Sequence, residues 1–378
     1  MAYILLLGSV IFISPITKKQ ETKNIVLLFY IFLLFFACTR FGIGTDYFNY
    51  YTIYTRSPKN FNSLTLLKLL FLEVEPGFAF IIILFKSLNL SYVQFIAFCS
   101  FIPLTLIFYT IQKYSINKAF SLFLFIANYY IVYIESALRQ GIAMSIFLYA
   151  ILCFISTKRI IKYLFLILIG ISFHVSLIVA LFIPIILKFN KKLFLNKYSV
   201  IILSIIAFAA GIVFFRSIVS IIPRANNYIG GDNNYSAMIL RSLNIILVLY
   251  IYKKVNNNLS QTEISLLKIY IFGNILYFFV CPISLFSRLT EYFIFLEIIL
   301  VPCMIKYLCK GKYFALAVYI LLFSFLFIKD IDSFLYQRDY YSKNILYYKH
   351  VTVFNKEEIS NEIPRGEYAK YFGNSRYK

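Results

Sequence analysis

One stretch of the chain places a carboxylate, a guanidinium and an amide close together between two apolar runs. Glu135 precedes Arg139 by four residues and Gln140 follows directly, between Ala119–Ile134 and Gly141–Ile155. A guanidinium in or near lipid costs at least about 2.5 kcal/mol, so it normally faces a protein cavity and has a function. Residues i and i+4 of a helix are also neighbours, so Glu135 could simply neutralise Arg139. The stretch alone leaves both interpretations open.

Arginine and lysine are distributed differently along the chain. Lysine fills the loops predicted to be cytoplasmic, where Arg159 is the exception, whereas the other arginines fall on or near the predicted outer face. The positive-inside rule predicts the opposite. Guanidinium binds phosphate bidentately and stays charged when half-buried, so an outward cavity with several arginines suits an anionic headgroup, above all a diphosphate. The arginines concerned are Arg40, Arg56, Arg139, Arg216, Arg224, Arg241 and Arg288.

Some of these arginines have a simpler explanation. Arg288 could cap the turn at Thr290 and Glu291. Arg216 and Arg241 could extend towards lipid headgroups while their stems stay in the membrane. Arg40, Arg139 and Arg288 are the strongest candidates, because each is predicted at the junction of a span and a loop with a helix breaker or an acid nearby.

Several groups near these arginines could accept a proton from an attacking hydroxyl. His174 lies between Ser172 and Ser176 in an apolar run, where it could equally be a neutral histidine bonded to a neighbouring carbonyl. Tyr47 follows an acid in a tyrosine-rich loop, and tyrosine rings with hydroxyls suit both the faces and the edges of sugars. The candidate proton acceptors are Asp46, Glu75, Glu135 and His174.

The composition defines the elements that must position these groups. Hydrophobic residues make up 61% of the 378 residues and charged residues 14%, and the mean hydropathy is +0.80. Soluble domains carry about 25% charged residues. We therefore predict an all-α polytopic integral membrane protein with roughly 11–14 transmembrane or re-entrant helices. Residues 1–329 should form a single membrane domain, in which Ala2–Ile16 is a retained span, and residues 330–378 a polar external tail.

The net charge of +21 does not indicate nucleic acid as a partner, because the charges form short loop clusters typical of cytoplasmic loops. The six cysteines are isolated, without a CxxC pair or a Cys/His cluster. This pattern suggests neither a metal site nor a disulfide framework, and we expect no cofactor.

Two segments should be irregular at membrane depth. Glu75-Pro76-Gly77 separates the short apolar pieces Leu64–Leu72 and Gly77–Phe85, which predicts a re-entrant or interfacial pair before a full span at Val93–Thr110. Tyr163–Leu187 has basic clusters at both ends, which fits a helical hairpin or bent pair of half-helices turning near His174. One tilted span is the alternative.

Five motifs in order resemble the EpsG/Wzy-like family of O-antigen, capsule and exopolysaccharide repeat-unit polymerases. They are RFGIGTDYFNYY from Arg40, EPGF from Glu75, ALRQGIAMSI from Ala137, SFHVSLIVAL from Ser172 and SRLTEYF from Ser287. The resemblance covers residues 40–295. It implies a multi-pass enzyme of the bacterial inner (plasma) membrane that joins undecaprenyl-diphosphate-linked repeats at the outer face by metal-independent glycosyl transfer.

The resemblance also implies roles for particular residues and partners. We expect the lipid-linked oligosaccharide as donor and acceptor, the bilayer, and a chain-length regulator as partners. The alternatives are a flippase or transporter of the lipid-linked sugar, and a glycan ligase or acyl-modifying protein of the same pathway. A flippase would be expected to show repeated halves and charges along a path through the membrane, and this sequence shows neither. The expected catalytic residues are Asp46, Glu135 and His174, and the expected diphosphate- or sugar-binding residues are Arg40, Tyr47, Arg139, Gln140, Arg241 and Arg288.

Overall fold

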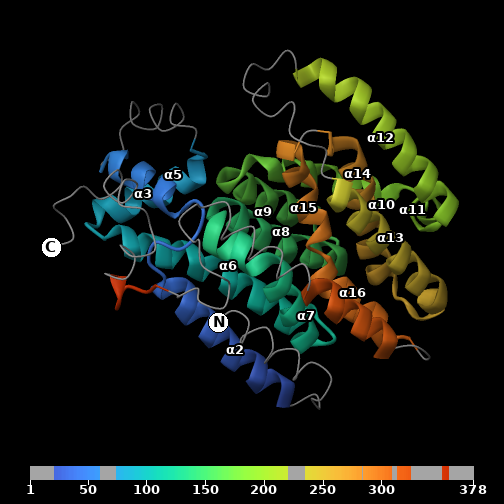
Figure 1. Cartoon of the computed structure of the whole chain (residues 1–378), viewed down its shortest axis with the longest axis horizontal. Coiled ribbons are helices and arrows are strands. Elements are labelled where there is room, and N and C mark those ends of the chain that lie inside the picture. Colours follow the sequence, from blue (N-terminus) through green and yellow to red (C-terminus); the bar gives the residue numbers. More distant parts are fainter. Residues whose placement is uncertain are drawn as a thin grey trace. The chain divides into compact units, whose positions relative to one another are not determined.

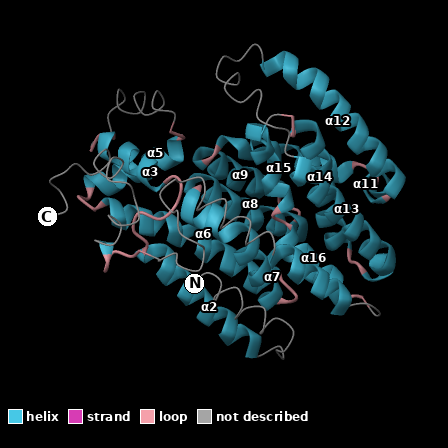
Figure 2. Cartoon of the chain, in the orientation of Figure 1, coloured by secondary structure: helices cyan, strands magenta, loops and turns pink. Residues whose placement is uncertain are grey.

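The computed structural model describes residues 21–59, 74–219, 235–282, 284–308, 313–324 and 351–356. Within these ranges the chain is built from helices, and its β pairing is an isolated antiparallel bridge between Arg40 and Thr352 (Figure 2). The prediction of an all-α polytopic membrane protein is confirmed. Five helices there are long and apolar enough to cross a membrane: Tyr92–Tyr114, Lys118–Ser136, Leu138–Thr157, Lys197–Phe214 and Gln261–Val280.

The chain divides into two compact units. The first comprises Met1–Tyr149, Leu168–Val175 and Leu316–Lys378, and the second comprises Ala150–Ile167 and Ser176–Ala315. The predicted boundary between residues 329 and 330 lies outside the described residues.

In the first unit, α2 (Glu21–Thr39) packs along α6 (Tyr92–Tyr114) and α7 (Lys118–Phe125) (Figure 1). The Tyr30 hydroxyl and the Thr105 hydroxyl lie 2.9 Å apart at the contact of α2 with α6. Such side-chain hydrogen bonds satisfy polar groups that lipid cannot.

Two short helices of this unit are not membrane spans. α3 (Tyr47–Arg56) has 10 residues and α5 (Pro76–Ser87) has 12. At about 1.5 Å per residue they fall well short of the roughly 30 Å hydrocarbon core. For α5 this agrees with the predicted re-entrant or interfacial piece Gly77–Phe85. The other predicted piece, Leu64–Leu72, lies outside the described residues.

The stretch around Glu135 has an unusual local conformation. α7 continues directly into η1 (Ile126–Ser136), a π-helix, and the Ala137 N–H donates to the Val132 carbonyl at 2.8 Å. α8 (Leu138–Thr157) then begins after a break at Ala137, so the two predicted spans are separate helices. π-Helical turns are rare and often lie at functional sites. The sequence did not predict this one.

The segment Tyr163–Leu187 folds back on itself. α9 (Ile160–Phe173) ends before His174, and η2 (Val175–Phe182) and α10 (Ile183–Lys188) follow. The Tyr163 hydroxyl donates to the Ala180 carbonyl at 2.7 Å. A straight helix would separate these two residues by about 25 Å along its axis. The predicted hairpin is therefore confirmed, and the single tilted span is wrong.

The second unit is organised around α14 (Gln261–Val280). Its start is fixed by a capping box, in which the Ser260 hydroxyl accepts from the Glu263 N–H and the Glu263 side chain accepts from the Ser260 N–H. In contrast to the largely buried α14, the apolar side chains of α12 are mostly exposed, as expected of a lipid-facing helix. The helices packed on α14 are α10, α11 (Lys191–Leu195), α12 (Lys197–Val219), α13 (Tyr235–Val255), α15 (Arg288–Ile294) and α16 (Glu297–Lys306).

Candidate functional site

Arg139 lies at the centre of a charged cluster in the first unit. Its Nη1 donates to the Glu75 carboxylate at 2.5 Å, and its guanidinium carbon lies 5.9 Å from the centre of the Tyr50 ring. The Tyr50 hydroxyl is also hydrogen-bonded to Arg139. The Arg139 and Glu75 side chains remain 26% and 16% exposed, so a ligand can reach the pair. We call Tyr50, Glu75 and Arg139 the Arg139 cluster.

The Tyr50 hydroxyl is neutral in this setting. Burial, with a smaller contribution from the charge of Asp46, raises the pKa of Tyr50 above its ordinary value. The hydroxyl therefore keeps its proton at neutral pH. Because α3 carries both Asp46 at its N-cap and Tyr50 one turn later, the acid lies beside the cluster.

Local backbone chemistry places Glu75 and His174. Glu75 is the N-cap of α5 in an extended conformation, and Pro76 occupies the first turn, where its missing N–H costs nothing. Gly77 approaches Ser172 so closely that a Cβ would overlap the serine hydroxyl and carbonyl. This contact brings the hairpin turn, with the half-buried His174, against the start of α5.

A glycine loop joins Arg40 to α3 and closes over the end of η1. Gly42 and Gly44 adopt φ values of 71° and 114°, which favour glycine. A Cβ at Gly44 would overlap the Glu135 carbonyl oxygen, and the Thr45 N–H donates to the Ser136 hydroxyl at 3.3 Å. The loop is therefore locked against the residues that lead into Arg139.

Four of the predicted site residues are buried. The Arg40 guanidinium donates to the Ala37 carbonyl at 2.8 Å and to the Ser100 hydroxyl at 2.7 Å, and Arg40 is 1% exposed. The backbone around Arg40 pairs with residues 351–353. The sequence placed these residues at an accessible outer face, whereas here they lie inside the protein. The other three buried site residues are Tyr47, Glu135 and Gln140, whose exposed fractions are 1%, 1% and 2%.

The second unit holds a cluster of the same composition. Arg241 on α13 donates to the Glu291 carboxylate on α15 at 2.8 Å, and its guanidinium carbon lies 5.4 Å from the centre of the Tyr277 ring. The two charged side chains are 19% and 18% exposed. We call Tyr277, Arg241 and Glu291 the Arg241 cluster. Arg288, exposed at the start of α15, lies one helical turn from Glu291.

Sequence reasoning missed all four partners of the two arginines, among them Tyr277, which lies within an apolar run. Glu75 was recognised as an outer acid but not as the partner of Arg139, from which it is 64 residues distant in sequence. Tyr50 was one of several tyrosines in its loop, and Glu291 was considered only as part of a turn. The available signal was the Pro-Gly pair after Glu75, which marks a fixed helix start. Arg216 and Arg224 cannot be placed, because the Arg216 side chain and all of Arg224 lie outside the described residues.

Fold and clusters together define a polytopic all-α membrane protein with half-buried Arg–Glu–Tyr clusters. A comparison with protein-family models gives a match over residues 23–350 to the EpsG family. The chain belongs to the EpsG family, a family of polysaccharide-polymerase-type membrane proteins. Comparisons with curated proteins and with solved structures find no match.

Proposed function

We propose that the chain is a polysaccharide repeat-unit polymerase that joins undecaprenyl-diphosphate-linked oligosaccharides at the outer face of the bacterial plasma membrane. The observation that carries this proposal is the Arg139 cluster. Its guanidinium is half-buried, remains reachable, and is held by groups that a diphosphate can displace. Membership of the EpsG family supports the same class of reaction.

Arg139 would act on the leaving group. In the reaction, a hydroxyl of the acceptor repeat attacks the anomeric carbon of the donor, and the bond from that carbon to the diphosphate oxygen breaks. Negative charge develops on the departing diphosphate. A guanidinium stabilises this charge in a site of low dielectric constant. Glu75 compensates the charge of Arg139 while the site is empty, which keeps an unpaired buried cation from destabilising the fold.

A base must accept the proton of the attacking hydroxyl, and two of the expected residues are accessible enough to be considered. His174 is half-buried at the hairpin turn beside α5, and Asp46 is half-buried at the start of α3. Both are reachable by a substrate, and neutral histidine is a common base near pH 7. We assign this role to His174 and sugar positioning to Asp46. The buried Arg40, Tyr47, Glu135 and Gln140 then act by holding the site together.

Deletion of the gene tests the proposal through the surface glycan. A polymerase mutant should produce glycan that carries a single repeat. Complementation with the intact chain should restore the ladder on a gel. Loss of all glycan would indicate a flippase instead, and free lipid-linked polymer would indicate a ligase.

A further inference from the structure

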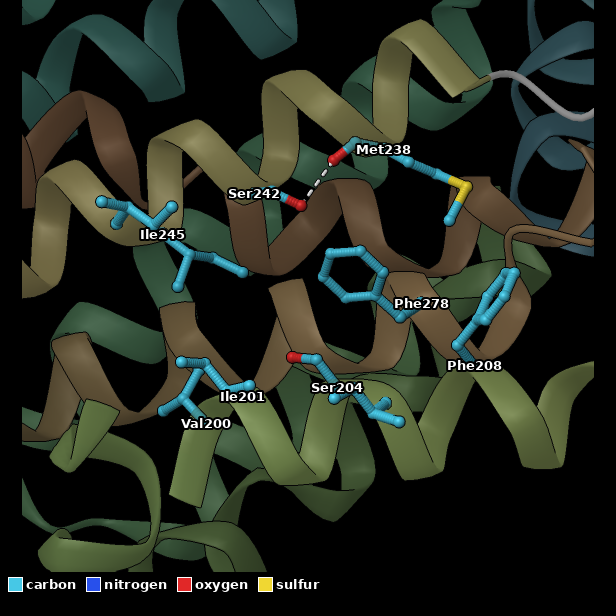
Figure 3. A pocket seen from close by; sticks show the side chains of 10 residues that line it. Val200, Ile201, Ser204, Phe208, Met238, Ser242, Ile245 and Phe278 are labelled. Carbon is cyan, nitrogen blue, oxygen red and sulfur yellow. Dashed lines mark hydrogen bonds between the residues drawn. The ribbon is translucent and has the colours of Figure 1, made fainter. Parts of the chain in front are cut away.

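An apolar groove lies among α12, α13 and α14 of the second unit, with a volume of about 340 Å³ (Figure 3). Small-molecule pockets have volumes of about 300–1,000 Å³. Among the described residues no charged side chain lines it, and its polar groups are the hydroxyls of Ser204 and Ser242. The Ser242 hydroxyl donates to the Met238 carbonyl at 2.9 Å, so it is satisfied within its own helix (Figure 3).

The groove runs along the helices. Its lining extends from Val200 to Phe208 on α12 and from Met238 to Ile246 on α13. Each stretch corresponds to about 12 Å along a helix axis. Since α12 and α14 are both long and apolar enough to cross a membrane, we place the groove at the depth of the hydrocarbon core. This shape suits a single extended apolar chain.

Arg241 and Tyr277 of the Arg241 cluster lie on the same helices as the groove. Met238 precedes Arg241 by one helical turn, and Ser242 follows it directly. On α14, Tyr277 of the cluster is next to Phe278 of the groove wall. A positive group beside an apolar groove is complementary to an amphiphile with an anionic head.

The predicted topology gives this amphiphile a direction. The other end of α13 carries Lys253 and Lys254, which the positive-inside rule places on the cytoplasmic side. Arg241 and the Met238 end of the groove then lie towards the outer face. A molecule with its head at Arg241 and its tail in the groove has the orientation of an outer-leaflet lipid.

We propose that this groove holds the polyprenyl tail of one lipid-linked saccharide, with the diphosphate of that molecule at Arg241. The inference rests on the proposed function, which requires two lipid-linked substrates. A polyprenyl lipid has one long chain and fills one groove, whereas a phospholipid would leave its second chain outside. Its diphosphate also offers Arg241 more anionic oxygens than a single phosphodiester does, and Arg288 lies one helical turn from the Glu291 that pairs with Arg241.

The absence of tryptophan from the whole sequence allows a specific test. The variants I205W and I206W each introduce a single tryptophan on α12. Ile205 lines the groove and is 64% exposed, and Ile206 does not line it and is 58% exposed. The full-length variants are reconstituted into phosphatidylcholine vesicles with brominated acyl chains, which quench tryptophan fluorescence.

Titration with undecaprenyl diphosphate should restore fluorescence in I205W in a saturable manner and leave I206W unchanged. Adding Arg241→Gln to I205W should shift the midpoint at least about tenfold upward, because a charged hydrogen bond contributes roughly 1.5–3 kcal/mol. Equal recovery with phosphatidylglycerol would mean an adventitious lipid only and would overturn the proposal. Absence of recovery in I205W would also overturn it, provided that native mass spectrometry of the unmodified chain shows no retained undecaprenyl diphosphate. Retention of that lipid would support the proposal.

These outcomes separate this inference from the proposed function. Recovery in a chain that makes no polymer would support the tail site and contradict polymerisation. Polymer formation by a chain that shows neither recovery nor retention would contradict the tail site alone.

Discussion

The two units carry clusters of the same composition in different surroundings. In each, an arginine pairs with a glutamate and lies over a tyrosine ring. The distance from the guanidinium nitrogen to the carboxylate oxygen is 2.5 Å in the Arg139 cluster and 2.8 Å in the Arg241 cluster. The guanidinium carbon lies 5.9 Å from the ring centre in the first and 5.4 Å in the second. The Arg139 cluster is bordered by a π-helix, a loop with positive-φ glycines and a hairpin turn. The Arg241 cluster is formed by regular helices and adjoins an apolar groove.

This difference indicates that the two clusters have different roles. Irregular backbone that is fixed by close packing positions several polar groups at one point, which a reacting centre requires. Regular helices beside an apolar groove provide a cation and a surface for a tail, which lipid binding requires. We therefore expect substitutions at the Arg139 cluster to reduce turnover, and substitutions at the Arg241 cluster to weaken substrate binding.

The largest effect should come from His174→Ala. Loss of a general base typically lowers the rate by about 10²–10⁴-fold, so polymer should disappear while protein abundance stays unchanged. The surface glycan ladder measures this. His350→Ala is the matched control, because the sequence contains two histidines. A normal ladder from His174→Ala would mean that His174 is not the base and only packs within the hairpin.

Arg139→Lys should have the next largest effect. It keeps the charge and removes the planar fork, and loss of one donor to a developing anion costs about 3–4 kcal/mol, or a hundred- to a thousandfold in rate. Glycan should shorten to one or a few repeats. The exposed Arg159 provides a control, since Arg159→Lys should leave chain length unaltered. Long polymer from Arg139→Lys would show that Arg139 does not hold the leaving group.

Arg241→Lys should have a smaller effect of a different kind. Loss of one charged hydrogen bond to the head group costs about 1.5–3 kcal/mol, which corresponds to a ten- to hundredfold increase in KM for the lipid-linked repeat. The value of kcat should change little, because this interaction is made equally before and during the reaction. Steady-state kinetics of the purified chain measure both constants. A fall in kcat at constant KM would remove the proposed difference between the two clusters.

Gly44→Ala should act through stability and not through charge. The new Cβ would occupy a position with φ of 114° and overlap the Glu135 carbonyl oxygen. Strain of this kind costs about 1–3 kcal/mol. The thermal unfolding midpoint of the purified protein should therefore fall. An unchanged midpoint would mean that the loop is not locked against η1 as described.

The sequence predicted elements better than it predicted contacts. Basic clusters at both ends of Tyr163–Leu187 predicted the hairpin because charge controls membrane crossing, and the Tyr163–Ala180 hydrogen bond confirms it. The pairing of Arg139 with Glu75 depends on tertiary packing between distant segments, which local spacing does not encode. The π-helix has a different reason: Gly141 approaches the Tyr133 carbonyl across the break at Ala137, a local backbone arrangement that the helical period of the sequence does not reveal.

The burial of Arg40 shows the same limit. A loop position beside glycines predicted an accessible cation, but residues 351–353 pair with the backbone beside Arg40. Only the folded chain brings together positions that lie more than 300 residues apart.

Reconstitution of the purified chain with a synthetic undecaprenyl-diphosphate-linked repeat tests the central claim most directly. The measurement is the length distribution of the glycan, together with the undecaprenyl diphosphate released. Polymerisation predicts a ladder of repeats and release of one undecaprenyl diphosphate for each linkage formed, with both lost together in Arg139→Lys. Unchanged substrate with the intact chain, or a ladder that Arg139→Lys leaves intact, would contradict the account.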